Sequence, residues 1–387
     1  MKSFYAVIGQ MVLSGSNYLI FLIFTVILSE THFINFSTAV ALNILAYAVA
    51  EGGISFVAPR EISKKDKTKP ILSGGFIFIS IFLYFIAITV GFNLWNFFSK
   101  DSLNIYWVVS YAFYFFPVLI IPSWLTCWSI DLTKLIVLSI VRGLSIVLVY
   151  FIPTSFGLLI SGALFLVFIL FFVNWLNKDE PILKTPNLKS IYVAKNMIME
   201  VFVSKTSSYV VYSLIPLVVA SIYGNKISSL YIIGERIKSM YATLFQPLIQ
   251  TVYLSINKDK KVKKSNLMPY SIALINVLIT MILIFVIYNN GVSFIGERFN
   301  SVPNLYIYIV SACLSILTAC LLYFKVLPTG NYKLFRIATY FQMGVFILLF
   351  IFMKFNDFLQ PETVLLFGEL SILLIVFIQL LLNKIRL

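Results

Sequence analysis

Residues 155–176 read SFGLLISGALFLVFILFFVNWL and contain no charged side chain. A helix needs about 20 such residues to cross the hydrocarbon core of a bilayer, which is roughly 30 Å thick, because each residue advances the helix by about 1.5 Å. Similar stretches recur along the whole chain of 387 residues, of which 60% are hydrophobic and only 11% charged, against about 25% charged in soluble domains. The sequence therefore predicts an all-α polytopic membrane protein.

About twelve transmembrane helices are expected from these apolar stretches. They lie at residues 5–28, 34–57, 71–97, 105–126, 131–152, 155–176, 193–222, 228–255, 267–288, 303–324, 335–354 and 362–383. No small-residue cleavage site follows the first stretch, so it is interpreted as a retained span rather than a signal peptide. The connecting loops are short, and we expect no attached soluble domain.

The net charge of +14 would suggest a nucleic-acid partner in a soluble protein. Here most lysines and arginines lie in alternate short loops, at residues 60–69, 178–189, 258–264 and 325–336, and in the C-terminal tail. Positive charge gathers in this way on the cytoplasmic side of membrane proteins. We therefore expect both termini in the cytoplasm and no nucleic-acid partner.

Residue types that support enzymatic or metal chemistry are scarce. The sole histidine, His32, lies in a short loop, and Cys127, Cys313 and Cys320 lie in or beside apolar segments without the spacing of a metal site. A single histidine in a loop gives little support for a histidine-based active site. We expect no metal, no cofactor and no enzymatic activity.

The two halves of the chain resemble each other in their polar residues. Three polar residues at spacings i, i+4 and i+7, which share one helical face, occur in both the first and the seventh spans. These residues are Gln10, Ser14 and Asn17 in the first span and Glu200, Ser204 and Ser207 in the seventh. Repeated bundles place a binding site between them, so we expect an N-lobe (1–176), a cytoplasmic connector (177–190) and a C-lobe (191–387) around a central cavity. The alternative is a chance alignment of polar residues.

Charged side chains inside spans are the most informative residues, because each costs about 2.5–3.5 kcal/mol at the centre of a helix and needs a partner or a watery cavity. The cations are Arg142, Lys205, Arg236 and Lys238. The acids are Glu51, Glu200, Glu235 and Glu369, and Asn43 lies on the same helical face as Glu51.

Two interpretations of these charges remain open. In the first, a cationic cavity binds an anionic ligand such as a phosphate, which suits the forked guanidinium of arginine, and the acids act as counter-charges or coupling-ion sites. In the second, the charges form structural ion pairs between helices. Glu235 and Lys238, at spacing i, i+3, are also candidates for a pair within one helix.

Four short segments resemble Wzx-type O-antigen and polysaccharide flippases. In the eighth span these are residues 231–238 (YIIGERIK) and 244–253 (LFQPLIQTVY). In the first half, residues 51–56 (EGGISF) and 60–63 (REIS) are similar to the glycine-rich end of the family's second span and to its cytoplasmic exit. The chain departs from the pattern at Gly234, where alanine is usual. Together with twelve spans in two repeats, the resemblance covers essentially the whole chain.

The resemblance implies membership of the multidrug, oligosaccharidyl-lipid and polysaccharide (MOP) exporter superfamily, whose two lobes open alternately to each side of the bacterial inner (cytoplasmic) membrane. The implied cargo is an undecaprenyl-diphosphate-linked oligosaccharide, an O-antigen repeat unit for lipopolysaccharide biosynthesis, and the implied transport is coupled to an ion gradient. Membrane lipid, the polysaccharide polymerase and the chain-length regulator are the implied partners. Arg236 matches a cavity arginine of related flippases, whereas Arg142 matches no motif.

Two alternatives to a flippase remain. One is a membrane-embedded polysaccharide polymerase or acyltransferase, although polymerases usually carry a large periplasmic loop and acyltransferases a histidine in the membrane core. The other is a drug exporter of the same superfamily, for which a less cationic cavity is expected.

Overall fold

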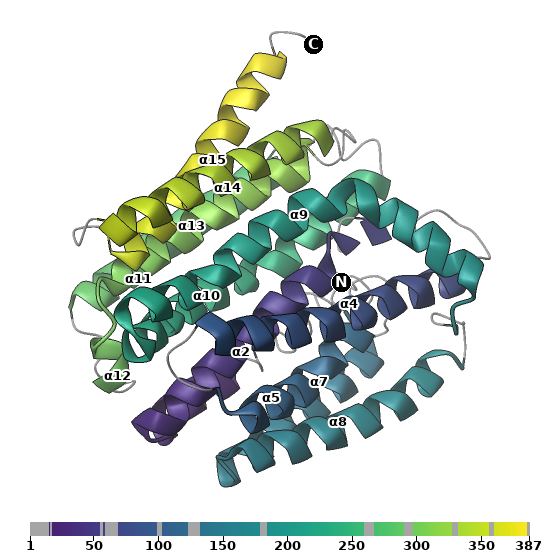
Figure 1. Cartoon of the computed structure of the whole chain (residues 1–387). Coiled ribbons are helices and arrows are strands. Elements are labelled where there is room, and N and C mark those ends of the chain that lie inside the picture. The colour runs from purple at the N-terminus through teal and green to yellow at the C-terminus, as the bar shows by residue number, and fades with distance from the viewer. Residues whose placement is uncertain are drawn as a thin grey trace. The chain divides into compact units, whose positions relative to one another are not determined.

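A computed structural model confirms the all-helical prediction wherever the chain is described (Figure 1). The structure describes residue 15 and residues 18–54, 57–58, 69–98, 103–122, 132–178, 184–258, 267–289, 297–326, 332–355 and 360–384. Each predicted span coincides with a helix in these ranges, the first of them through residues 18–27. Seven of the described helices are by themselves long and apolar enough to cross a bilayer. The chain is therefore a multi-pass membrane protein.

Two compact units make up the chain, Met1–Thr206 and Ser207–Leu387. They divide within one long helix, α9 (Leu188–Tyr223). The boundaries expected for the two lobes and their connector stay predictions, as does the central cavity.

The first unit contains five complete helices and part of a sixth that carry element labels. They are α2 (Glu30–Glu51), α4 (Lys69–Phe98), α5 (Ile105–Ile120), α7 (Leu132–Phe151), α8 (Ser155–Leu176) and the first part of α9. Helix α2 packs against α4 and α5, and α8 packs against α5 and α7. Helices α5 and α8 approach closely at Gly162, where a Cβ would lie 2.5 Å from the backbone nitrogen of Tyr114. Small residues allow membrane helices to come together in this way.

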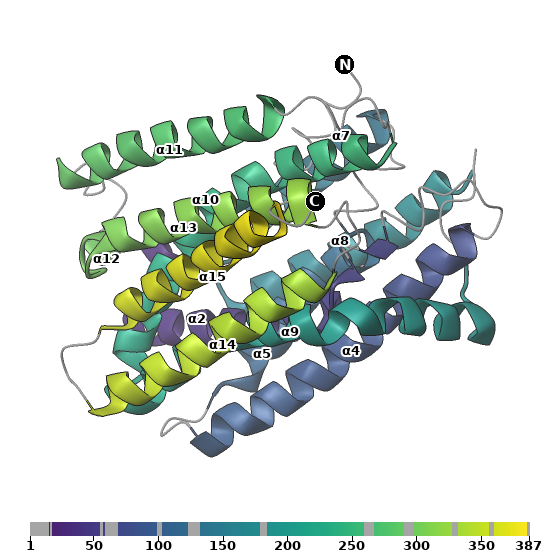
Figure 2. The same cartoon turned by 90° about the horizontal axis from the view of Figure 1, so that it is seen from above.

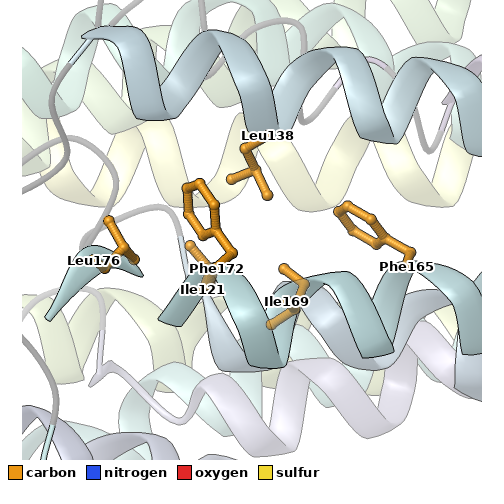
Figure 3. Packing of buried hydrophobic residues seen from close by; sticks show 6 residues of the cluster. All are labelled: Ile121, Leu138, Phe165, Ile169, Phe172 and Leu176. Atoms are coloured by element: carbon orange, nitrogen blue, oxygen red, sulfur yellow. The ribbon is translucent and has the colours of Figure 1, made fainter. Parts of the chain in front are cut away.

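An apolar core holds α7 and α8 together, as Figure 3 shows. Its buried residues are Ile121, Leu138, Phe165, Ile169, Phe172 and Leu176. On α8 the buried positions are spaced by three or four residues, which is one face of a helix. This face positions Phe165 for the arginine contact described below.

Two glycines end α2 earlier than its apolar run suggests. The span was expected to reach residue 57, but the helix stops at Glu51 because Gly52 and Gly53 have φ angles of 45° and 84°. Glycine adopts this left-handed conformation without the strain that a Cβ brings. A Cβ at Gly52 would also lie 2.6 Å from the ring of Phe202. The glycine-rich segment noted in the sequence is therefore a helix end that passes close to α9.

The second unit contains the rest of α9 and the helices that follow it (Figures 1 and 2). They are α10 (Asn225–Lys258), α11 (Leu267–Tyr288), α12 (Glu297–Asn300), α13 (Leu305–Leu321), the π-helical turn η2 (Leu322–Val326), α14 (Tyr332–Phe355) and α15 (Pro361–Lys384). Helix α13 packs against α10, α11 and α15, and α14 packs against α15. Helix α13 is thus surrounded by neighbours and carries many of this unit's buried residues.

Apolar side chains also cover the outward surfaces of the helices. On α11, for example, the exposed residues include Leu274, Leu278, Met281, Ile282 and Phe285. Such a surface is unfavourable in water but suits the acyl chains of a bilayer, where helices satisfy their own backbone hydrogen bonds. The exposed face of α11 therefore fits an environment of lipid.

Candidate functional site

Helix α10 carries three charged residues within two turns, Glu235, Arg236 and Lys238. The helix packs against α13 along this stretch, and Gly234 makes the close approach possible. A Cβ at Gly234 would lie 2.4 Å from the ring of Tyr308 in α13. The glycine that departs from the flippase pattern therefore has a physical reason, because alanine would collide with this tyrosine.

Arg236 pairs with the residue beside it. Its Nη2 atom lies 2.8 Å from Oε2 of Glu235, and the two side chains are 11% and 21% exposed. The hydroxyl of Ser239 donates to the other carboxylate oxygen of Glu235 at 2.8 Å. The buried Nε of Arg236 has no hydrogen-bond partner among the described residues. Arg236 therefore has one hydrogen-bond donor, Nε, that no described residue uses, although Glu235 balances its charge.

Lys238 forms an ion pair with an acid from another helix. Its Nζ donates to Oε1 of Glu369 in α15 at 2.5 Å, and both side chains are buried. Glu235 and Lys238 were candidates for a pair within α10; the ion pairs seen are Glu235 with Arg236 and Lys238 with Glu369. A buried pair is costly to break because the remaining charge is left without compensation. This contact fits the structural interpretation of the intramembrane charges.

Arg142 lies inside the first unit, on α7, and is 1% exposed. Its guanidinium carbon lies 3.8 Å from the ring centroid of Tyr114 and 4.7 Å from that of Phe165. Its Nη1 donates to the backbone oxygen of Tyr114 at 3.2 Å. Aromatic faces attract cations, and Arg is the usual partner. In this arrangement the guanidinium helps to join α5, α7 and α8, and its predicted contact with an anionic ligand stays a prediction.

The polar residues predicted on α2 lie in the first unit as well. Asn43 is fully buried; its Nδ2 donates to the oxygen of Ala39 at 2.8 Å and to that of Val108 at 3.4 Å. Its Oδ1 accepts a hydrogen bond from the hydroxyl of Tyr84. Asn43 thereby joins α2, α4 and α5. Glu51 is half-buried at the last position of α2.

Several predicted residues fall outside the description. Gln10, Ser14 and Asn17 lie outside the described residues. Glu200, Ser204, Lys205 and Ser207 belong to helix α9, but their side chains lie outside the description. Their roles stay predictions.

One buried acid was missed by the sequence analysis. Glu362 is 1% exposed, and Nδ2 of Asn304 donates to its Oε1 at 2.8 Å. At the start of the last predicted span, an acid is ordinary because a helix N-terminus favours negative charge. The sequence contained one signal, because Glu362 is the first residue of the predicted span 362–383. That position does not show whether the side chain is buried.

No family model matches the sequence, and no curated protein matches it significantly. Solved structures do match over nearly the whole chain. A MOP superfamily transporter from Pyrococcus furiosus, described as having a binding pocket of reversed polarity that suggests a different function, has a TM-score of 0.67 at 15% identity and covers 100% of this chain and 94% of its own.

Two MATE transporters also match. The eukaryotic MATE transporter AtDTX14 has a TM-score of 0.66 at 13% identity, with 99% and 95% of the two chains covered. An outward-facing multidrug resistance MATE family transporter of the MOP superfamily has a TM-score of 0.62 at 14% identity, with 100% and 95% covered. The chain therefore has the fold of these transporters.

Proposed function

We propose, from the fold shared with MOP superfamily transporters and the residues of α10, that this chain is a flippase. Its cargo would be an undecaprenyl-diphosphate-linked oligosaccharide, an O-antigen repeat unit, moved from the cytoplasmic to the periplasmic leaflet of the bacterial inner membrane by alternating access. The transport would be driven by an ion gradient, and the polysaccharide polymerase and chain-length regulator would be partners. The resemblance of residues 231–238 and 244–253 to Wzx-type flippases supports this cargo.

The single observation that carries the proposal is the state of Arg236. Its guanidinium is held beside Glu235, partly exposed, with the Nε donor unused among the described residues. An arginine fork binds two phosphate oxygens at once. A diphosphate could therefore compete with Glu235 for the guanidinium, and the buried Nε would become available to it once the side chain moves. Glu235 would act as the counter-charge that keeps Arg236 in place when no substrate is bound.

The other cations are given different roles in this proposal. Lys238 already meets Glu369 and positions α10 against α15. Arg142 is enclosed by aromatic rings and would have to leave them before it met a ligand. We therefore assign the first contact with the diphosphate to Arg236.

A drug exporter is the second candidate, because a multidrug resistance transporter shares the fold. The two candidates differ in what they require of Arg236. An anionic headgroup needs its positive charge, whereas a neutral or cationic drug is repelled by it or indifferent to it.

A complementation experiment tests the proposal. In cells deleted for this chain, we would express the wild type, Arg236→Ala, Arg236→Lys and a matched control, Arg336→Ala, which removes an exposed arginine of α14. The readouts are long-chain surface polysaccharide and the leaflet in which lipid-linked repeat units accumulate. Loss of one or two charge-assisted hydrogen bonds, each worth about 1.5–3 kcal/mol, predicts about a tenfold or larger fall for Arg236→Ala.

Arg236→Lys is expected to retain part of the activity, and Arg336→Ala all of it, at equal protein levels. Repeat units that collect on the cytoplasmic face of the deletion strain would support a flippase. Collection on the periplasmic face would instead indicate a polymerase defect and contradict the proposal. An unchanged polysaccharide ladder together with altered drug resistance would favour the exporter.

A further inference from the structure

The first turns of helix α9 expose apolar and basic side chains next to one another. Leu188 and Tyr192 are 87% and 64% exposed, and with the exposed Lys195 they occupy positions i, i+4 and i+7, which share one face of a helix. Lys189, also exposed, borders this face. Residues 184–199 contain three lysines and no acidic residue. This face of α9 therefore combines positive charge with apolar surface.

The opposite face of the same turns packs on helix α4. Ser190 and Ala194 are buried there. Gly75 of α4 permits the approach, because a Cβ at this position would lie 3.0 Å from the backbone oxygen of Ser190 and 3.4 Å from the Cβ of Ala194. A Cβ at the adjacent Gly74 would collide with the backbone oxygen of Lys184. The start of α9 is thus held beside the start of α4 (Figure 1), and this contact sets which side chains point outward.

A reciprocal pair of hydrogen bonds begins the helix at this point. The backbone nitrogen of Ser190 donates to Oδ1 of Asn187 at 2.8 Å, and the backbone nitrogen of Asn187 donates to Oγ of Ser190 at 3.1 Å. This arrangement is that of a capping box, which satisfies donors that the first helical turn leaves free. Leu188 and Lys189 therefore lie in an ordered helical turn and keep fixed positions on its surface.

This surface lies at one end of the membrane spans. The apolar part of α4 begins at Ile71, so Gly75 lies about 6 Å inside it at about 1.5 Å per residue. Because Ser190 packs at that depth, the residues before it in the chain lie at the level of the lipid headgroups. Lys195 lies about 8 Å further along the helix, and a lysine at that depth extends its apolar stem and brings its ammonium group to the headgroups.

The charges of this surface match an anionic lipid. Among the described residues, Lys184, Lys189 and Lys195 form no ion pair. An anionic headgroup complements them better than a zwitterionic one, which brings a positive charge together with its phosphate. Leu188 suits the acyl chains, and tyrosines such as Tyr192 are enriched at the membrane–water interface, where the ring is apolar and the hydroxyl remains hydrated.

We propose that Lys184, Lys189 and Lys195, together with Leu188 and Tyr192, form a binding surface for anionic phospholipids in the leaflet at this end of α9. The lysines contact the phosphodiester oxygens of the headgroups, and the two other side chains pack against the upper part of the acyl chains. The bound lipids stabilise the start of α9 in its position on α4. The surface belongs to the first unit and does not depend on which cargo the protein carries.

The test is thermal unfolding of the purified full-length protein in detergent, while a short-chain phosphatidylglycerol is titrated in. Phosphatidylcholine with the same acyl chains is titrated in parallel. A ligand that binds only the folded state raises its stability with a saturable concentration dependence. We expect phosphatidylglycerol to raise the Tm at lower concentrations than phosphatidylcholine. Added sodium chloride should reduce this difference, because salt screens exposed charges.

Variants locate the response on this surface. Lys189→Gln should raise the half-saturating phosphatidylglycerol concentration about fivefold, since a lysine near an anionic lipid surface contributes about 1 kcal/mol. The triple variant with glutamine at 184, 189 and 195 should respond to phosphatidylglycerol no more than to phosphatidylcholine. Arginine at the same three positions retains the charge and should keep the wild-type difference. The matched control, Lys226→Gln, removes an exposed lysine of α10 in the second unit and should respond as the wild type does.

Equal responses of the wild type to the two lipids would overturn the proposal. So would a full phosphatidylglycerol response in the triple glutamine variant. Inorganic phosphate titrated alone should leave the Tm unchanged; a rise at the concentrations at which phosphatidylglycerol acts would show that the ligand is a free anion rather than a lipid. If the triple glutamine variant fails to fold, Lys189→Gln decides alone, and an unchanged half-saturating concentration in that variant would contradict the lipid surface.

Discussion

The two units hold their buried arginines in different ways. In the first unit, Arg142 lies between the rings of Tyr114 and Phe165, donates to a backbone oxygen and is 1% exposed. In the second unit, the Arg236 side chain is 11% exposed, pairs with the adjacent Glu235 and has a buried Nε without a partner among the described residues. Both satisfy the rule that a charge within the membrane needs compensation. The two arginines are both largely buried but differ in their contacts, and the ligand contact proposed for Arg236 depends on this difference.

The largest effect on stability is expected at Lys238, which forms a buried ion pair in the second unit. Lys238→Met leaves Glu369 buried without its cation and should lower the free energy of unfolding by about 3–5 kcal/mol. Denaturation of the purified protein in detergent measures this loss. The double variant Lys238→Met, Glu369→Leu should recover most of it, because a buried pair can be replaced by apolar side chains at little cost. Equal losses in the single and double variants would show that the pair is not the cause.

A smaller loss is expected at Arg142. Arg142→Met removes the contacts with two aromatic rings, worth up to about 2 kcal/mol, and a hydrogen bond worth about 1 kcal/mol. Stability should therefore fall by roughly 2–3 kcal/mol. Transport per folded molecule should stay near the wild-type rate, as a flipping assay in proteoliposomes would measure. A variant that folds as the wild type does but fails to transport would place Arg142 at the ligand instead.

Glycine positions provide a third comparison between the units. Gly234→Ala brings a methyl group to 2.4 Å from the Tyr308 ring and should destabilise the protein by about 1–3 kcal/mol, the usual cost of overpacking. The matched control is Gly143→Ala, next to Arg142, where nothing lies within 4 Å of the new Cβ. There the better helix propensity of alanine should leave stability unchanged or raise it by up to about 1 kcal/mol. Similar melting temperatures for the two variants would show that Tyr308 does not restrict position 234.

The sequence predicted the helices because an apolar run long enough to span a bilayer has few other structures available to it. It could not predict which charges pair. Lys238 and Glu369 are separated by 131 positions, and they meet only because α10 and α15 both pack against α13. The spacing rule for neighbours on one helix made Glu235 a candidate partner of Lys238, whereas the ion pair seen for Glu235 is with Arg236.

Only part of the candidate site was predictable, because contacts between helices distant in sequence cannot be read from the sequence. Arg236 was found from its resemblance to a flippase motif and from its position in a span. Glu362 was missed, because an acid in the first turn of a helix is common and its burial depends on helices distant in sequence. The unused donor of Arg236 is visible only in the structure.

The most direct measurement of the central claim is the affinity of the purified protein for undecaprenyl diphosphate, compared between Arg236→Ala and Arg142→Met. Because Arg236→Ala leaves Glu235 without its cation, binding is measured per folded molecule for both variants. Arg236→Ala should weaken binding about tenfold or more, while Arg142→Met should bind as the wild type does. Wild-type affinity in Arg236→Ala, with binding lost in Arg142→Met, would contradict this claim.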